Sequence, residues 1–408
     1  MPFCLSLCPY CDFVVYSGAA ARGARGRVEP FLAALAAELR LRAAALDAQF
    51  GPPGTAERPP LQTVYLGGGT PSLLAAAAVA ALLELIEDRY GLAAGAEITL
   101  EANPGPADRG DLAGFRAAGV TRLSLGAQSL DAGELRRIGR RHAPADVVDA
   151  AAEARAAGIG SLSLDLLYDL PGQSLSSWHR TLEAALELGP DHLSAYALTL
   201  DDPEAEGLAG PSGDHLPVRP GARRWRDAAR PMQDADRAAD MYTLLDTRLA
   251  AAGLAWYELS NWSRPGRQSR HNLVYWRRLP YEAVGPGAHA FDGARRRRWN
   301  AARLDAYLAA LLPHAGAAPP ARTAPRAAPA LPPGGEETLD DAQALAEQAV
   351  LGLRLAEGLD PLLAAADVVA PALAWGRAAG LVKSRSDGGA ALTLRGRLLG
   401  DELFSRLV

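Results

Sequence analysis

Short apolar runs rich in β-branched and aromatic residues alternate along most of the chain with longer, alanine-rich runs of helical periodicity. The runs that predict strands are Leu61–Leu66, Glu97–Leu100, Arg122–Leu125, Leu162–Leu166, His192–Leu200 and Trp256–Leu259. The runs that predict helices are Glu29–Gln49, Leu73–Arg89, Asp111–Ala118, Ala145–Ala157, Leu175–Leu188 and Asp234–Ala252. Strands that alternate with helices of this length indicate βαβ units and a parallel sheet. Right-handed crossovers curl such a sheet toward a barrel or partial barrel.

Polar and glycine-rich residues recur where the predicted strands end. In chain order they are Gly67, Gly68, Gly69 and Thr70, then Glu101 and Asn103, then Gln128, then Asp165 and Asp169, and finally Tyr196. Because β/α barrels build their sites from the carboxyl ends of several strands, the sequence predicts a site at this rim. Taken singly, a glycine run is often only a tight turn, and an aspartate after a strand often only caps a helix.

Two segments interrupt the alternation, and a smaller unit follows them. Residues 201–231, rich in Pro, Gly, Asp and Arg, predict a surface insertion in a first domain that spans residues 1–312. Residues 313–336 are Pro/Ala-rich and predict a linker. In residues 337–408 we expect elements over Asp340–Glu357, Pro371–Gly380, Leu381–Ser384, Ala391–Thr393 and Arg395–Leu407. Their order of helix, helix, strand, strand and helix predicts a small α+β, winged-helix-like domain.

Composition narrows the classes of function. The net charge of −5 gives no global basic footprint, so we expect no nucleic-acid partner. The chain has no run of 18 apolar residues free of charge and no signal peptide ahead of the core, so we expect a soluble, cytoplasmic protein. Clustered cysteines with none elsewhere argue against a disulfide framework and for a reducing compartment.

All three cysteines lie close together near the start, as Cys4, Cys8 and Cys11 with the spacing C-x3-C-x2-C. Three thiolates on one short loop can hold three corners of a cubane [4Fe–4S] cluster. Such clusters normally take four cysteines, so the fourth iron is left for a non-cysteine ligand. An open iron beside a pocket can bind a small molecule. Two other interpretations stay open: three unrelated thiols, or a zinc site completed by a histidine.

Together these motifs resemble the radical S-adenosylmethionine (SAM) proteins around oxygen-independent coproporphyrinogen III dehydrogenase and, among them, the HemW-type haem chaperones. The resemblance rests on PFC-x3-C-PYC-DF at the start, YLGGGTPS at 65–72, EANPG at 101–105, LGAQS at 125–129, GRRH at 139–142, DLLYDLPGQ at 165–173, RHNLVYW at 270–276 and LGLRLAEGLD at 351–360. It covers nearly the whole chain apart from the insertion and the linker. It implies a radical SAM partial (β/α) barrel with a small C-terminal domain.

The resemblance also implies two cofactors and the residues that hold them. A [4Fe–4S] cluster is expected on Cys4, Cys8 and Cys11. The implied SAM contacts are Tyr10, Gly68, Gly69, Thr70, Glu101, Gln128, Arg140 and Asp165. Glycine lets the backbone approach the amino acid end of SAM closely. Arg140 offers a fork geometry for its carboxylate, and Asp165 suits the ribose diol.

Two features favour the haem-chaperone branch. Phe13 stands where the dehydrogenases carry a further cysteine. His271, Asn272, Tyr275 and Trp276 match the HNxxYW element that the resemblance links with haem binding, and imidazole is a natural ligand of haem iron. A lone histidine is more often a hydrogen-bonded structural residue. The run 295–298, four arginines, is most often a solvated face, although it could also meet haem propionates.

The implied function is a haem chaperone that binds haem and delivers it to an acceptor protein, which by family analogy is a membrane-associated one. An alternative is an enzyme that oxidatively decarboxylates coproporphyrinogen III, and Phe13 counts against it. A third is a scaffold that binds neither group. Whether the protein is an enzyme, which acceptor it serves and whether it forms a homodimer are left open. Family members carry a further stretch before the cysteine motif, so we expect the first barrel strand to be nearly absent here.

Overall fold

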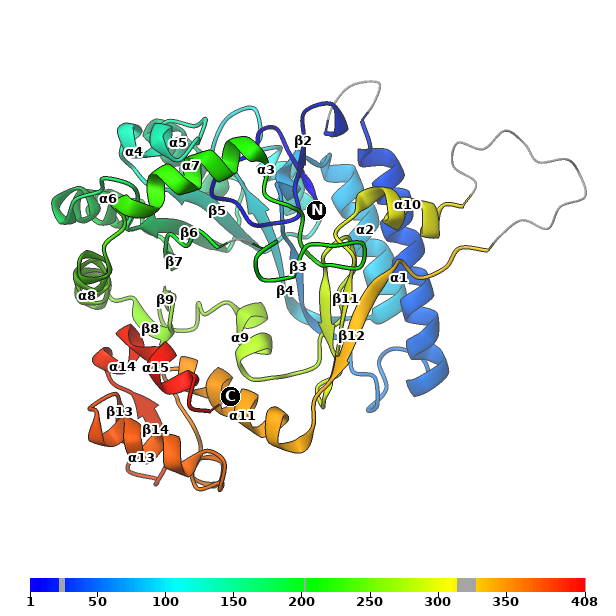
Figure 1. The fold of residues 1–408 in the computed structure, drawn as a ribbon. Helices are drawn as coiled ribbons and strands as arrows, with labels where there is room; N and C mark the ends of the chain where they lie inside the picture. The colour runs from blue at the N-terminus through cyan, green and yellow to red at the C-terminus, as the bar shows by residue number, and fades with distance from the viewer. Residues whose placement is uncertain (22–25, 202, 314–327, 408) are drawn as a thin grey trace, which may run out of the picture.

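The structure is a computed structural model that describes residues 1–21, 26–201, 203–313 and 328–407 (Figure 1). Its large sheet consists of β3 (Leu61–Leu66), β4 (Leu92–Ala102), β5 (Arg122–Gln128), β6 (Ser161–Tyr168), β7 (His192–Ala197), β8 (Ala255–Glu258) and β9 (Asn261–Ser263). The spatial order is β3-β4-β5-β6-β7-β9-β8. Pairs from β3 to β7 are parallel, and β9 joins β7 and β8 antiparallel. The predicted partial barrel is thereby confirmed, with a short hairpin at one edge.

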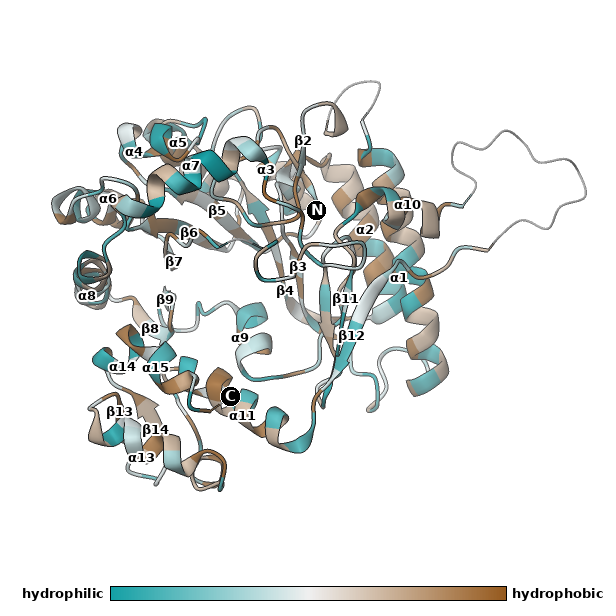
Figure 2. Cartoon of the chain, in the orientation of Figure 1, coloured by the Kyte–Doolittle hydropathy of each residue, from teal (hydrophilic) through white to brown (hydrophobic). Residues whose placement is uncertain are grey.

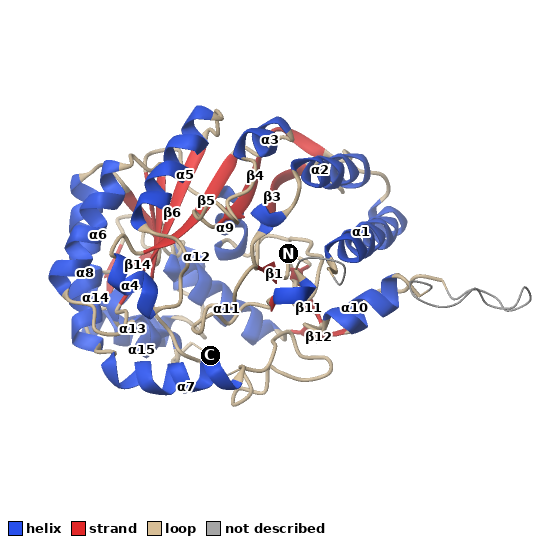
Figure 3. Cartoon of the chain, turned by 90° about the horizontal axis from the view of Figure 1, so that it is seen from above, coloured by secondary structure: helices blue, strands red, loops and turns tan. Residues whose placement is uncertain are grey.

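Helices follow the strands at the six predicted runs, and two more, α4 (Ala132–Arg137) and α10 (Leu304–Leu311), were not predicted. The predicted ones are α1 (Val28–Phe50), α2 (Ala76–Tyr90), α3 (Leu112–Ala117), α5 (Pro144–Ala156), α6 (Leu175–Glu187) and α8 (Ala235–Ala251). They mix hydrophobic and hydrophilic residues (Figure 2), and α1 buries Phe31, Leu35 and Leu39. Figure 3 shows α1, α2, α5 and α6 in an arc outside the sheet. α2 begins later than predicted because Pro71–Leu73 form a 3₁₀ turn.

The two faces of the strands differ in polarity because successive side chains alternate. Leu100, Leu123 and Leu164 are fully buried in the main core, together with residues of the covering helices. Their neighbours Glu101 and Asp165 line a cavity on the opposite face of the sheet. The alternation therefore directs carboxylates inward from the carboxyl half of the sheet. No helix in the described part of the chain is long and apolar enough to cross a membrane.

A three-stranded antiparallel sheet extends the barrel. It is made of β10 (His289–Phe291), β11 (Arg296–Asn300) and β12 (Gly334–Thr338). The predicted linker is thus wrong at its end, since residues 334–336 pair with β11, while residues 314–327 lie outside the described residues. The four arginines of the run form ion pairs with Asp341, Glu336, Glu337, Glu347 and Glu282. The arginines at 295–298 are thus paired with carboxylates, and they do not line the cavity described below.

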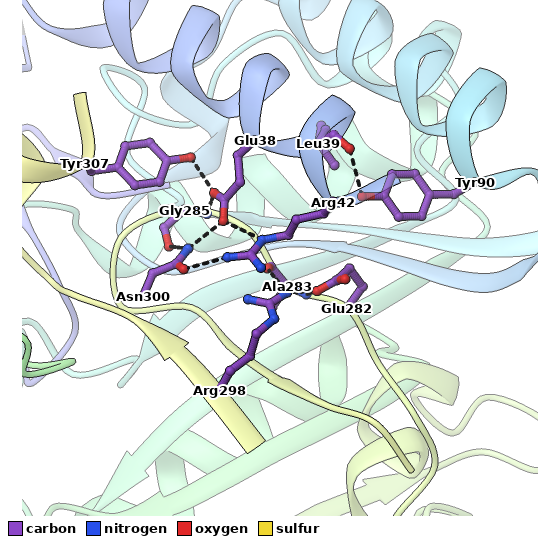
Figure 4. A network of polar contacts seen from close by, with 10 residues as sticks. All are labelled: Glu38, Leu39, Arg42, Tyr90, Glu282, Ala283, Gly285, Arg298, Asn300 and Tyr307. Carbon is purple, nitrogen blue, oxygen red and sulfur yellow. Dashed lines mark hydrogen bonds and ion pairs between the residues drawn. The ribbon is translucent and has the colours of Figure 1, made fainter. Parts of the chain in front are cut away.

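A buried carboxylate fixes this extension to α1 (Figure 4). Glu38 is fully buried and accepts hydrogen bonds from Arg42 Nε at 2.7 Å and Tyr307 Oη at 2.7 Å. It also accepts from the Gly285 amide at 2.8 Å and Asn300 Nδ2 at 2.8 Å. A buried charge is tolerated only when it is paired and hydrogen-bonded, and here four donors from separate elements meet one carboxylate.

The C-terminal residues form a unit with its own core. It consists of α11 (Asp341–Arg354), α12 (Pro361–Ala364), α13 (Ala370–Ala378), β13 (Val382–Ser384), β14 (Ala390–Leu392), α14 (Leu394–Leu398) and α15 (Gly400–Phe404). Leu353, Leu373 and Leu403 are fully buried there. Arg397 donates to both carboxylate oxygens of Asp246 on α8, at 2.9 and 2.6 Å, which ties this unit to the barrel. The order of elements agrees with the predicted small α+β fold, while the exact domain boundaries stay predictions.

Candidate functional site

One cavity of about 1260 Å³ brings together the barrel rim, the cysteine loop and the C-terminal unit. The three cysteines line it, and so do all eight residues that the resemblance implied for SAM. From the C-terminal unit, Arg354, Arg397 and Asp401 contribute to the wall. Small-molecule sites typically measure about 300–1,000 Å³, so this cavity has room for more than one bound group.

The cysteines enter the cavity from a short segment beside the sheet. Cys4 ends β1 (Phe3–Cys4), which pairs with β2 (Tyr16–Ser17) outside the large sheet. A turn in which the Cys11 amide donates to the Cys8 carbonyl at 3.2 Å presents the other two thiols. Burial raises the pKa of Cys4 and raises that of Cys11 to about 12. These thiols are therefore protonated when free, and binding of iron must release their protons.

Three free cysteines supply the thiol donors on the cavity wall. In the residues that the structure describes, no group of three or more His, Cys, Asp or Glu side chains is arranged to hold one metal ion. Three thiols that face one cavity from separate points of a loop fit a cluster of several irons, whose corners lie apart.

Hydrogen bonds link two of the cysteines through the strand ends. Cys4 Sγ and Thr70 Oγ1 are 3.1 Å apart, and Asn103 Nδ2 donates to Thr70 Oγ1 at 3.0 Å. Arg140 Nη2 donates to Asn103 Oδ1 at 2.6 Å, while its Nη1 lies 3.8 Å from Cys8 Sγ. Asn103 was predicted at the rim by its place after the strand, but it was given no role toward SAM. Arg140 thus holds its guanidinium between the cysteine loop and the rim.

Glu101 is a buried, hydrogen-bonded carboxylate of the rim. It accepts from Tyr65 Oη at 2.6 Å and from the Gly68 amide at 2.9 Å. Burial raises the pKa of Glu101 to about 7, and the nearby Asp165 adds to this. Tyr65, which sequence reasoning missed, also lines the cavity. The Glu101 carboxyl can therefore meet a cationic ligand here, either as a carboxylate or as a hydrogen-bonding acid.

The glycines of the rim are required by a backbone contact that the sequence did not show. A Cβ on Gly69 would lie 2.7 Å from the Phe3 carbonyl oxygen, and Gly68 has a φ of 109°. The Thr70 amide donates to the same Phe3 carbonyl at 2.8 Å. Glycine is needed at this loop because the backbone of Phe3, just before Cys4, packs against it and leaves no space for a Cβ.

The remaining predicted SAM residues lie around the same space. Asp165 accepts from Ser124 Oγ at 3.0 and 2.9 Å, and burial raises its pKa. Gln128 ends β5 with a φ of 64°, a conformation uncommon for residues other than glycine. Tyr10 sits between Cys8 and Cys11 in the loop and lines the cavity.

One helix of the predicted surface insertion contacts the cysteine loop. Residues 201–231 include α7 (Pro220–Ala229), whose Arg226 is only 4% exposed. Arg226 donates to the carbonyls of Pro9 at 3.0 Å, Tyr10 at 3.1 Å and Cys11 at 3.0 Å, and also to that of Asp201. One guanidinium thereby clamps the backbone between the second and third cysteines. The surface insertion thus stays a prediction, while its helix α7 contributes one buried arginine that holds the loop.

Arg226→Met should loosen the cysteine loop without unfolding the barrel. The loop carbonyls lose their shared donor, so Cys11 becomes more accessible and its thiol reacts faster. Alkylation of the metal-free protein, followed by mass spectrometry, is expected to be several-fold faster at Cys11. The exposed neighbour Arg224→Met is the matched control and should react like the parent protein. Equal rates in both variants would contradict the clamp.

The four residues implied for haem lie on α9 (Arg270–Trp276), packed beside β3. His271 shares hydrogen bonds of 2.8 Å with Thr63 Oγ1 and with Tyr275 Oη, and its ring stacks on Tyr65 at 5.1 Å. Burial lowers the pKa of His271 to about 4, so the ring is neutral near pH 7. A neutral imidazole is the form that ligates a metal.

The structure brings only part of the α9 motif to the cavity. Asn272 lines it, whereas His271, Tyr275 and Trp276 do not. Trp276 instead packs on the guanidinium of Arg354, 4.4 Å from the ring centre, and Arg354 does line the cavity. At the loop side, Phe13 is 57% exposed and lines the cavity.

Comparisons with known proteins agree with this geometry. The model of the radical SAM superfamily matches residues 1–185. The chain is 40% identical to the heme chaperone HemW of Mycobacterium tuberculosis, covering 100% of this chain and 93% of that protein. It is 37% identical to the heme chaperone HemW of Escherichia coli, covering 71% and 68%. The solved structure of the E. coli coproporphyrinogen III oxidase HemN, a radical SAM enzyme, aligns with a TM-score of 0.76 over 100% of this chain and 88% of that one. At 22% identity this alignment shows a shared fold.

Proposed function

Because the chain belongs to the HemW family of radical SAM proteins, we propose that it binds haem and delivers it to an acceptor protein. The observation that carries this proposal is the 40% identity to a heme chaperone along the whole chain. The large cavity supports it, since a haem chaperone of this family needs space for cargo beside its cofactors.

The family implies a [4Fe–4S] cluster and SAM, and the residues present fit both. Cys4, Cys8 and Cys11 would hold the cluster, which when bound supplies an electron to SAM. Arg140 and Glu101 are placed to hold the carboxylate and ammonium of the SAM amino acid end, and Asp165 its ribose. Arg226 holds the carbonyls of the cysteine loop against α7.

Arg140→Lys is expected to weaken SAM binding by about tenfold, which corresponds to ~1.4 kcal/mol. A lysine ammonium cannot reproduce the guanidinium fork that spans Asn103, Gly126 and a ligand carboxylate. The dissociation constant of SAM would be measured by equilibrium dialysis at matched iron content. Arg141→Lys, exposed on the cavity wall, is the control and should bind SAM normally. Equal affinities in the two variants would remove Arg140 from the SAM site.

His271→Ala tests the haem ligand. In the structure both ring nitrogens are hydrogen-bonded, so ligation requires His271 to exchange its bond with Tyr275 or Thr63 for one to iron. We expect the variant to bind haem more weakly and with a shifted Soret band. His179→Ala, on the exposed face of α6, serves as the control. An unchanged affinity and spectrum would show that another residue ligates the iron.

The second candidate function is the oxidative decarboxylation of coproporphyrinogen III, which the fold shared with HemN favours. Phe13 stands at the cavity where that branch carries a further cysteine, and this weighs against it. Product analysis under anaerobic conditions separates the two functions. Porphyrinogen consumed in step with 5′-deoxyadenosine release would make the protein an enzyme of that class.

We extend the proposal to the cellular compartment of the protein and to the acceptor of its haem. Three free thiols are maintained in a reducing compartment, which supports a cytoplasmic location. Family analogy supports a membrane-associated acceptor of the haem and leaves a homodimer open. Transfer of haem from the loaded protein to a haem-free acceptor, followed at the Soret band, tests delivery. Retention of all haem in the presence of a competent acceptor would contradict it.

A further inference from the structure

The cavity includes a region that the SAM residues do not account for. Its wall there comes from Tyr196 on β7, from Leu259 and Ser260 between β8 and β9, from Asn272 on α9 and from Arg354 at the end of α11. This region lies where the barrel meets the C-terminal unit, since the Ala356 amide donates to the Tyr257 carbonyl at 2.9 Å. A second ligand beside SAM would therefore contact both parts of the protein.

Several buried polar atoms in this region have no hydrogen-bond partner within the residues that the structure describes. They include Glu258 Oε2, Asn261 Oδ1, Trp276 Nε1 and Arg354 Nε. A buried polar group without a partner lowers the stability of the protein. Of these four residues only Arg354 lines the cavity, so its guanidinium is the group among them that a ligand in the cavity can reach.

Arg354 is the cation of this region. It makes no ion pair with a carboxylate in the described parts of the chain, whereas its neighbour in the wall, Arg397, is bound twice by Asp246. Trp276 supports its guanidinium from one side at 4.4 Å. Burial raises the pKa of the nearby Glu258 and the charge of Arg354 partly offsets this rise, but the two side chains form no ion pair. A guanidinium held on an aromatic face beside a cavity is suited to bind a carboxylate.

We propose that Arg354 binds a propionate carboxylate of the haem cargo, so that haem occupies the region between the barrel and the C-terminal unit. This inference rests on the proposed haem binding and adds the residue and the chemical group that fix the cargo. Tyr196, 43% exposed on the same wall, offers an aromatic face to the macrocycle. Trp276, which supports the Arg354 anchor, shares the short helix α9 with the implied iron ligand His271.

The test compares haem with haem dimethyl ester, in which both propionates are neutral. Wild-type protein should bind haem about tenfold more tightly than the ester. This ratio is the gain in affinity expected from about one charge-assisted hydrogen bond. Arg354→Gln should lose this preference by binding haem more weakly while its affinity for the ester is unchanged. Arg354→Lys, which keeps the charge, should restore part of the preference. Arg277→Gln, next to Trp276 but paired with Glu357 at the surface, is the control and should behave as wild type.

Each remaining outcome counts against a defined claim. Wild-type protein that binds haem and its ester equally well overturns the carboxylate contact, and this result does not depend on how any variant folds. A variant that weakens both ligands to the same degree assigns Arg354 a structural role and overturns it too. Wild-type protein that binds neither ligand overturns the proposed function, and the inference with it.

Discussion

Cys8→Ser is expected to leave a folded barrel that retains little iron after anaerobic reconstitution. The described chain offers no fourth thiol, so a lost ligand has no replacement. A serine oxygen is a harder and poorer ligand for these irons than thiolate. The large sheet begins at β3 and does not include the loop, so its fold should persist. Iron and sulfide analysis should show the loss, and the EPR change on adding SAM should disappear.

Ser6→Ala is the matched control for this prediction. Ser6 lies in the same loop and lines the same cavity, and its replacement by alanine leaves all three thiols in place. If the cysteines were ordinary buried residues, Cys8→Ser would cost only about 1–2 kcal/mol of stability and leave the cofactor content unchanged. A Cys8→Ser protein with full iron, full sulfide and a normal response to SAM would therefore refute the cluster assignment.

Glu38→Ala is expected to lower the free energy of unfolding by about 3–5 kcal/mol, because it leaves a buried arginine without its counter-charge. Arg42, Asn300 and Tyr307 would all lose their common acceptor. Urea unfolding followed by circular dichroism measures the change. Glu84→Ala, exposed on α2, is the control and should stay within about 0.5 kcal/mol of the parent. Equal unfolding midpoints for the two variants would show that the network contributes nothing to stability.

The parallel sheet and its rim could be predicted because both leave periodic signals in the sequence. A leucine that faces the helices alternates with a polar residue that faces the cavity, as in the pair Leu100 and Glu101. The cysteine spacing and the motif at each strand end then placed the predicted cluster and SAM residues, and all of them line one cavity.

What escaped prediction depends on contacts between residues far apart in the chain. Arg226 is one arginine among many in a Pro/Gly-rich segment, and nothing local shows that it reaches Cys11. Glu38 occupies an ordinary helix position until Tyr307 and Asn300 fold against it. His271 matched a haem motif, but its orientation toward Thr63 and Tyr65 follows from how α9 packs on β3.

The most direct test of the account is an anaerobic titration of haem into the reconstituted protein with SAM present, followed at the Soret band. The account predicts a saturable signal at an equimolar ratio of haem to chain. Coproporphyrinogen III added in place of haem should remain undecarboxylated. A protein that retains its iron and sulfide and responds to SAM, yet shows no saturable Soret change, would contradict the account.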